Sequence, residues 1–144
     1  MTPAQIFQFV NTFVLPGWLL LIFLPKWKWT DKIITGIIVT ILAIFYVYYI
    51  AKFFMPADIK SFGSLHGVMQ LFTNQTAVLA GWIHYLAFDL MTGLFEIKNA
   101  QKNNISHLLI IPCLFFTFMF GPIGLLLFFL IRFIKTKNCF AVNY

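Results

Sequence analysis

Residues 82–90 read WIHYLAFDL and carry one acidic side chain, Asp89, inside an otherwise uncharged and apolar run. His84 lies five residues before that carboxylate. A carboxylate in membrane hydrocarbon costs about 3 kcal/mol on insertion scales, so it usually faces the interior of a helix bundle and a polar partner. The run therefore predicts a membrane-spanning helix with a functional site around Asp89.

The composition of the whole chain indicates an integral membrane protein. Of its 144 residues, 61% are hydrophobic, 10% are charged and 19 are phenylalanines, which a soluble core of this length would be too small to bury. The net charge is +6, and the basic residues flank the apolar runs, as is typical of residues that anchor helices at lipid headgroups. We therefore expect a single transmembrane domain over residues 1–144, with membrane lipid as a partner and no nucleic acid.

Uncharged apolar windows predict an all-α fold, an integral membrane four-helix bundle. Each window is long enough to cross a hydrocarbon core of about 30 Å. The four spans are expected at about residues 5–24, 33–54, 75–96 and 107–133. Between the second and third spans, residues 56–73 repeat apolar side chains at helical spacing, which predicts an amphipathic or re-entrant helix closing one mouth of the bundle.

Two local features refine this arrangement. Asn74 is expected to cap the third helix, and Pro122 to kink or break the fourth, because proline removes one backbone hydrogen bond. The freed carbonyl, near residue 118, should face protein or a cavity, since lipid offers it no partner. With four crossings the Lys and Arg residues divide five to five between the two sides, so the positive-inside rule selects no orientation.

One face of the third helix gathers its polar and aromatic side chains at steps of three, four and seven residues, namely Trp82, Tyr85, Asp89, Thr92 and Glu96. His84 lies about 140° away from Asp89 on the same wheel, at 100° per residue. Two interpretations remain open, a hydrogen-bond cluster that holds helices together and a functional site. The cost of a carboxylate within a span favours the second.

Metal binding is the next possibility that the sequence raises. His107 opens the fourth helix near Glu96, where it could serve as a helix-end or interface residue or belong to a site. Histidine and acidic side chains are suitable metal ligands, but no His-x-x-x-His or Glu-x-x-His spacing occurs. We therefore expect no metal ligands and no cofactor, and keep a metal- or haem-binding membrane protein as an alternative.

Three signatures follow one another along the chain. Residues 80–90 read AGWIHYLAFDL, residues 105–109 read ISHLL, and residues 112–125 begin with PCL and end with FGPIGL. Together they resemble the abscisic-acid-deficient-4-like family, small four-helix membrane proteins whose plant members are linked to neoxanthin synthesis. The positions that match the family pattern are Trp82, His84, Asp89, His107, Gly121 and Pro122.

This resemblance implies isomerisation of a carotenoid, or of a related isoprenoid, from an epoxide end group to an allene without a redox cofactor. An acid must polarise the epoxide oxygen while a base removes a proton from a neighbouring carbon. As catalytic residues we expect Asp89, His84 and His107. The expected substrate-binding residues are Trp82, Tyr85, Glu96, Gly121 and Pro122.

The main alternative is a non-catalytic protein that binds carotenoid or serves as a membrane scaffold. The chain shows no evident plastid transit peptide, and its usage of Ile, Lys, Phe and Asn resembles that of bacterial proteins, so we expect a bacterial inner membrane. A homo-oligomer is compatible with the sequence.

Overall fold

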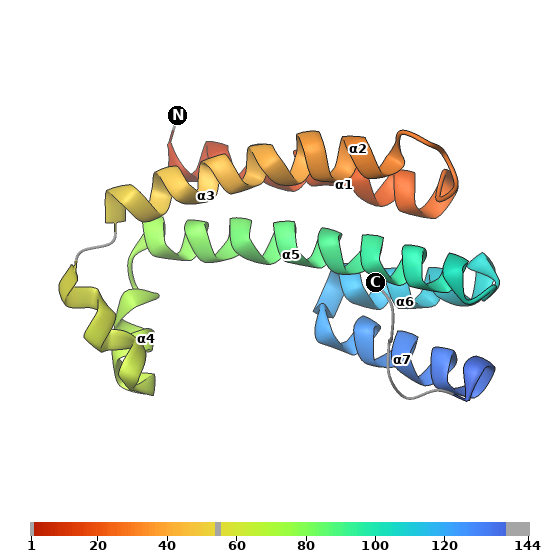
Figure 1. The fold of residues 1–144 in the computed structure, drawn as a ribbon. Coiled ribbons are helices and arrows are strands. Elements are labelled where there is room, and N and C mark those ends of the chain that lie inside the picture. Colours follow the sequence, from red (N-terminus) through yellow and green to blue (C-terminus); the bar gives the residue numbers. More distant parts are fainter. Residues whose placement is uncertain (1, 54–55, 138–144) are drawn as a thin grey trace.

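The computed structural model describes residues 2–53 and 56–137, which fold into helices joined by short turns (Figure 1). The helices are α1 (Pro3–Phe23), α2 (Thr30–Ile33), η1 (Ile34–Val39), α3 (Thr40–Phe53), η2 (Pro56–Gly63), α4 (Leu65–Leu71), α5 (Gln75–Lys102), α6 (His107–Phe120) and α7 (Pro122–Thr136). The expected all-α fold is thereby confirmed.

The long helix α5 lies at the centre, and α1, α3, α6 and α7 all pack against it (Figure 1). Close packing is possible because glycines lie at the helix contacts. A side chain at Gly17 would meet Leu90, and one at Gly93 would meet Trp18. As expected, Asn74 caps α5, its side-chain oxygen accepting a hydrogen bond from the backbone N–H of Thr76 at 2.8 Å.

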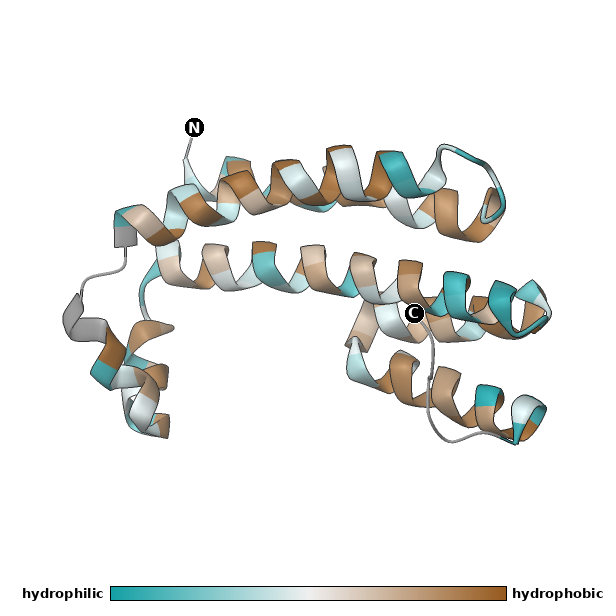
Figure 2. Ribbon diagram, viewed as in Figure 1, coloured by the Kyte–Doolittle hydropathy of each residue, from teal (hydrophilic) through white to brown (hydrophobic). Residues whose placement is uncertain are grey.

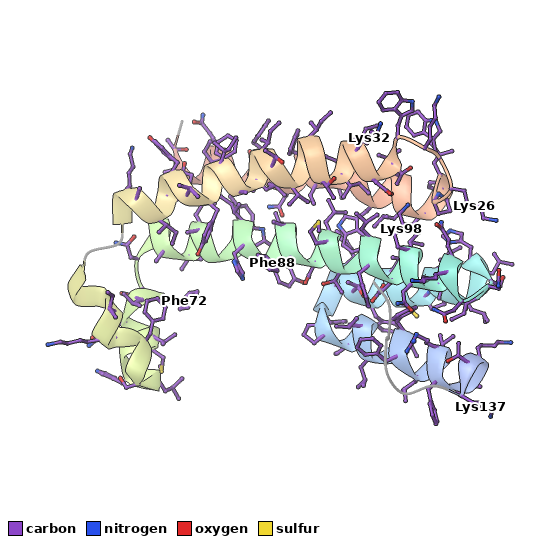
Figure 3. The ribbon with its side chains drawn as sticks, in the orientation of Figure 1. Lys26, Lys32, Phe72, Phe88, Lys98 and Lys137 are labelled. Atoms are coloured by element: carbon purple, nitrogen blue, oxygen red, sulfur yellow. The ribbon has the colours of Figure 1, made fainter. Side chains whose placement is uncertain are left out.

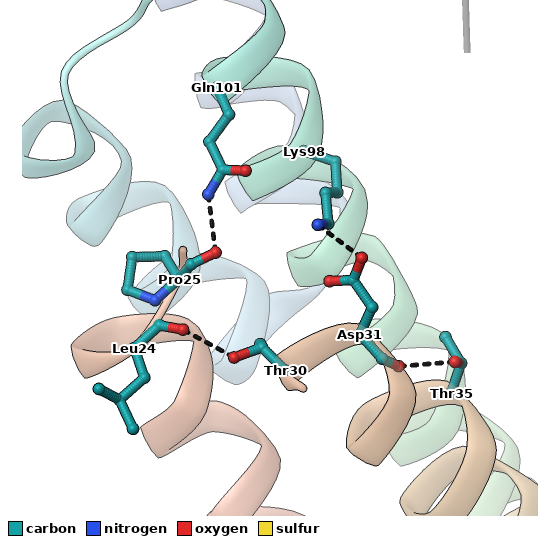
Figure 4. Close-up of polar contacts among 7 residues, drawn as sticks. All are labelled: Leu24, Pro25, Thr30, Asp31, Thr35, Lys98 and Gln101. Carbon is teal, nitrogen blue, oxygen red and sulfur yellow. Dashed lines mark hydrogen bonds and ion pairs between the residues drawn. The ribbon is translucent and has the colours of Figure 1, made fainter. Parts of the chain in front are cut away.

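The helices α2, η1 and α3 form one continuous segment that runs antiparallel to α1 (Figure 1). Polar contacts tie the connection between α1 and α2 to the end of α5 (Figure 4). Asp31 pairs with Lys98 at 2.5 Å, and the Gln101 amide donates to the Pro25 carbonyl at 2.7 Å. An ion pair and a hydrogen bond therefore hold this end of the bundle together in addition to apolar packing.

Three helical segments, Pro3–Phe23, Thr30–Lys52 and Gln75–Lys102, are long and apolar enough to cross a membrane. Their outward faces are apolar as well, as Figure 2 shows. Large side chains on these faces are exposed, for example Phe23 (72%), Ile44 (64%) and Phe88 (62%). Apolar surface this extensive is typical of helices surrounded by lipid.

The structure differs from the prediction in the span expected at 107–133. The chain does not continue through this region as one kinked helix; it reverses at Gly121, and α7 returns along α6 towards the end from which α6 started (Figure 1). The α6 helix has 14 residues and a length of about 21 Å, less than the roughly 30 Å of hydrocarbon. The two helices pack closely beside the reversal, because Gly124 has no side chain. A Cβ at that position would overlap with Thr117 and with the Cys113 carbonyl.

The segment expected to be amphipathic forms η2 and α4, with Ser64 capping α4 by accepting from the Gly67 N–H at 3.1 Å. It extends sideways from the end of the bundle, so it does not close the mouth as expected (Figure 1). Its apolar side chains remain exposed, including Leu65 at 78% and Met69 at 62%. This exposure favours an interfacial helix over a re-entrant one.

Candidate functional site

Asp89 lies near the middle of α5, and its carboxylate points at the turn between α6 and α7. The side chain is half-buried. One oxygen lies 2.7 Å and the other 3.3 Å from where a Cβ on Gly121 would stand. The carboxylate therefore contacts protein from another helix, as the sequence predicts.

Gly121 makes this contact possible in two ways. Its φ of +49° and ψ of −93° belong to a region that residues with a Cβ rarely adopt. Its missing side chain also leaves the space that the Asp89 oxygens occupy. Pro122 then opens α7, where a missing N–H costs nothing because the first turn of a helix has no partner for it. The Gly-Pro pair thus ends one helix and begins the next beside a carboxylate.

The Tyr85 hydroxyl lies between this carboxylate and the broken end of α6. It donates to the Phe118 carbonyl at 3.4 Å and is within hydrogen-bonding range of Asp89, one turn further along α5. The carbonyl near residue 118 thus faces protein, as predicted. Tyr85, Asp89 and the turn at Gly121 form one contiguous polar site. We call the two side chains alone the Tyr85–Asp89 pair.

Glu96 forms a second polar centre, two turns from Asp89 towards Lys102. Its side chain is fully buried, and one carboxylate oxygen accepts a hydrogen bond from the Thr117 hydroxyl at 2.7 Å. The other oxygen, Oε2, has no hydrogen-bond partner among the described residues, and neither has Oδ2 of Asp89. The bond joins α5 to α6 and helps to hold the hairpin in place.

A cleft of about 340 Å³ lies next to Tyr85, between α1, α5 and the end of α6. It arises because α6 stops at Phe120 and covers only part of the α1–α5 pair. The lining is largely apolar, with Tyr85 as the link to Asp89; the lining residues are Asn11, Thr12, Val14, Leu15, Trp82, Tyr85, Leu86, Phe118 and Met119.

The structure places Trp82 at this cleft but separates the two expected histidines from it. The Trp82 indole N–H donates to Asn11 at 2.9 Å. The His84 ring is exposed and stacks on Phe88, with ring centroids 4.4 Å apart, and it also meets Tyr46 of α3.

His107 lies at the end of the bundle where α5 and α6 join, and its Nε2 is 2.8 Å from the Ile22 carbonyl. Neither His84 nor His107 contacts Asp89 in the structure. Of the remaining expected binding residues, Gly121 shapes the site, while Glu96 is sealed behind α6.

Sequence reasoning missed two polar residues of this region, Asn11 and Thr117. Both lie in strongly apolar helices, where a single polar side chain needs a partner, and that requirement was the available signal. The sequence does not show which partner each side chain bonds to, because the partner depends on how the helices pack. Among the described residues, no three His, Cys, Asp or Glu side chains come together as metal ligands.

Fold and site together define a helical protein with apolar helices of membrane-spanning length and a carboxylate held against the turn between two helices. The family model described as ABA DEFICIENT 4-like matches residues 5–128, and the chain belongs to that family. This agrees with the resemblance seen in the sequence motifs.

A curated relative is the protein named ABA DEFICIENT 4, chloroplastic, from Arabidopsis thaliana. It is 26% identical over 110 residues, which cover 71% of this chain and 50% of the relative. The chain thus spans about half the length of the relative that it matches. That name places the relative in the chloroplast, so the comparison gives the expected bacterial inner membrane no support. No solved structure matches the chain.

Proposed function

We propose that this protein is a membrane-embedded acid–base isomerase that acts on a carotenoid, or a related isoprenoid, with an epoxide end group. The observation that carries the proposal is the Tyr85 hydroxyl, which lines an apolar cleft and has the Asp89 carboxylate beside it. The chain's membership of the ABA DEFICIENT 4-like family agrees with a carotenoid-related role.

The cleft suits an apolar ligand that arrives from the lipid. Its walls come from α1 and α5, and the short α6 leaves it uncovered. Aromatic and aliphatic side chains such as Trp82, Leu86 and Met119 would pack against a polyene, while Tyr85 supplies a hydroxyl for a polar end group. An epoxide oxygen would be the group that this hydroxyl recognises.

The chemistry needs one acid and one base in contact, and Tyr85 and Asp89 supply them. In a 5,6-epoxide, the Asp89 carboxylate would remove a proton from C7, the chain carbon next to the epoxide carbon C6. The electrons of the broken C7–H bond form the new C6=C7 double bond beside the existing C7=C8 bond. The C6–O bond breaks, and the Tyr85 hydroxyl gives its proton to the epoxide oxygen. The proton held by Asp89 then returns to the Tyr85 oxygen, so the step is a net isomerisation and restores both residues.

His84 and His107 would take no part in this step, because their rings contact other parts of the protein. Glu96 would act at a distance, by holding α6 against α5 through Thr117. The isomerisation leaves the overall oxidation state of the substrate unchanged, so the step balances without a redox cofactor.

Expression in a host that makes 5,6-epoxy carotenoids tests the proposal. Pigment extracts separated by chromatography should contain the allenic isomer with the wild-type protein and none with Asp89→Asn, which keeps the side chain's shape but removes the carboxylate. Asp31→Asn is the matched control, because Asp31 lies in an ion pair at the end of the bundle, and it should retain conversion.

The runner-up function is carotenoid binding without turnover. It would be favoured if the wild-type protein purified with unaltered epoxy carotenoid and no host extract contained the allene. If Asp89→Asn and wild type converted equally, the acid–base role of Asp89 would be wrong.

A further inference from the structure

The reversal at Gly121 changes which residues share an end of the molecule. The α1–α2 connection, the α5–α6 connection and the end of α7 lie at one end, and η2 with α4 lies at the other (Figure 1). Figure 3 shows Lys26, Lys32, Lys98 and Lys137 together at the first end. A single crossing by residues 107–133 would instead have carried the end of α7 to the opposite side.

Basic residues are distributed very unequally between these two ends. Seven exposed lysines lie at the first end and form what we call the basic rim, namely Lys26, Lys28, Lys32, Lys98, Lys102, Lys135 and Lys137. Buried Arg132 lies near the same end, in the last turns of α7. The two remaining basic residues, Lys52 at the end of α3 and Lys60 in η2, belong to the other end. The five-to-five division expected for four crossings thus becomes eight to two.

We infer that the basic rim faces the non-translocated side of the membrane and binds anionic lipid headgroups, with three crossings and a half-length hairpin beneath it. Lysines next to membrane-spanning helices are retained on the non-translocated side. They also attract the acidic lipids of that leaflet. This inference rests on the membrane insertion proposed above and is independent of the chemistry at Asp89.

Tryptophans at the rim support its position at the headgroup level. Trp27 and Trp29 are both nearly half exposed, at 44% and 45%. The Trp29 ring holds the ammonium of Lys32 at 4.8 Å and that of Lys28 at 5.8 Å. Tryptophan is enriched where apolar helix surface meets headgroups, and a ring paired with lysines suits a layer that contains phosphate.

Labelling of single cysteines tests the topology. In a chain with Cys113→Ala and Cys139→Ser, one cysteine is introduced at a time by Ser106→Cys, Lys137→Cys or Gly63→Cys. In sealed membrane vesicles, a membrane-impermeant maleimide should label positions 106 and 137 from the same side, and position 63 from the other. Labelling of position 137 together with position 63 would overturn the inference. Alkaline extraction of the same vesicles separates failures, because release of the protein would instead contradict membrane insertion.

Lipid binding is tested on the detergent-solubilised protein with phosphatidylglycerol and with phosphatidylcholine. Phosphatidylglycerol should raise the unfolding midpoint more than phosphatidylcholine does, and salt should reduce the difference. The variant Lys28→Gln/Lys135→Gln should bind phosphatidylglycerol at least twofold more weakly, whereas the matched Lys52→Gln/Lys60→Gln should keep wild-type binding. Equal effects of the two lipids on the wild type, or equal loss in both variants, would overturn the inference.

Discussion

Gly121→Ala tests the turn that holds the candidate site, because two separate features of the structure oppose a side chain there. The backbone φ of +49° with ψ of −93° is a conformation that costs a residue with a Cβ about 1–3 kcal/mol. The new methyl group would also stand 2.7 Å from an Asp89 oxygen, so the carboxylate would have to move. The gain from a less flexible unfolded chain is smaller, about 0.4–1 kcal/mol. We expect a net loss of about 1–3 kcal/mol in the free energy of unfolding.

The assay is an unfolding titration with sodium dodecyl sulfate in mixed micelles, followed by circular dichroism. Gly36→Ala is the matched control, since nothing beyond the local helix backbone lies within 4 Å of the place that its new methyl group would take, and it should be neutral or slightly stabilising. Equal unfolding midpoints for Gly121→Ala and Gly36→Ala would refute the reasoning about the turn.

Three further substitutions probe the surrounding contacts. Thr117→Val removes the donor to buried Glu96 and should lower the free energy of unfolding by about 1–3 kcal/mol in the same titration, whereas Thr117→Ser should keep most of it; equal losses would show that the hydroxyl contributes nothing. Trp82→Phe removes the hydrogen bond to Asn11 and should lower the free energy of unfolding by about 1 kcal/mol. A midpoint equal to or above that of the wild type would show that this bond does not stabilise the fold. His84→Gln should change epoxide conversion by less than about twofold, because its ring contacts aromatic side chains away from Asp89; a loss of about 10²–10⁴-fold, typical of a general acid or base, would place His84 in the reaction.

Much of the fold could be predicted because its signals are local. Uncharged windows identify α1, the segment that ends in α3, and α5, and the wheel of α5 places Tyr85 and Asp89 on one face. The break at Gly121 also follows from the sequence, since glycine and proline there cannot both continue a helix.

The direction of the chain after Gly121 could not be predicted in the same way. A kinked crossing and a full reversal are both compatible with a helix break at Gly121. Which of them forms depends on how the helices pack, and the sequence alone does not show that packing. The reversal depends on Gly124 lying against Thr117, and on Asp89 filling the space beside Gly121. The same limit applies to the site, because the bond between Glu96 and Thr117 exists only once α6 lies along α5.

Turnover by the purified protein tests the central claim most directly. The protein is placed in lipid nanodiscs that contain a 5,6-epoxy carotenoid, without added metal or redox cofactor, and the pigments are separated by chromatography over time. The account predicts allenic product with the wild type, a loss of about 10²–10⁴-fold with Tyr85→Phe and with Asp89→Asn, and full conversion with Asp31→Asn. Unchanged conversion by both Tyr85→Phe and Asp89→Asn, or a wild-type protein that binds the pigment and never isomerises it, would contradict the account.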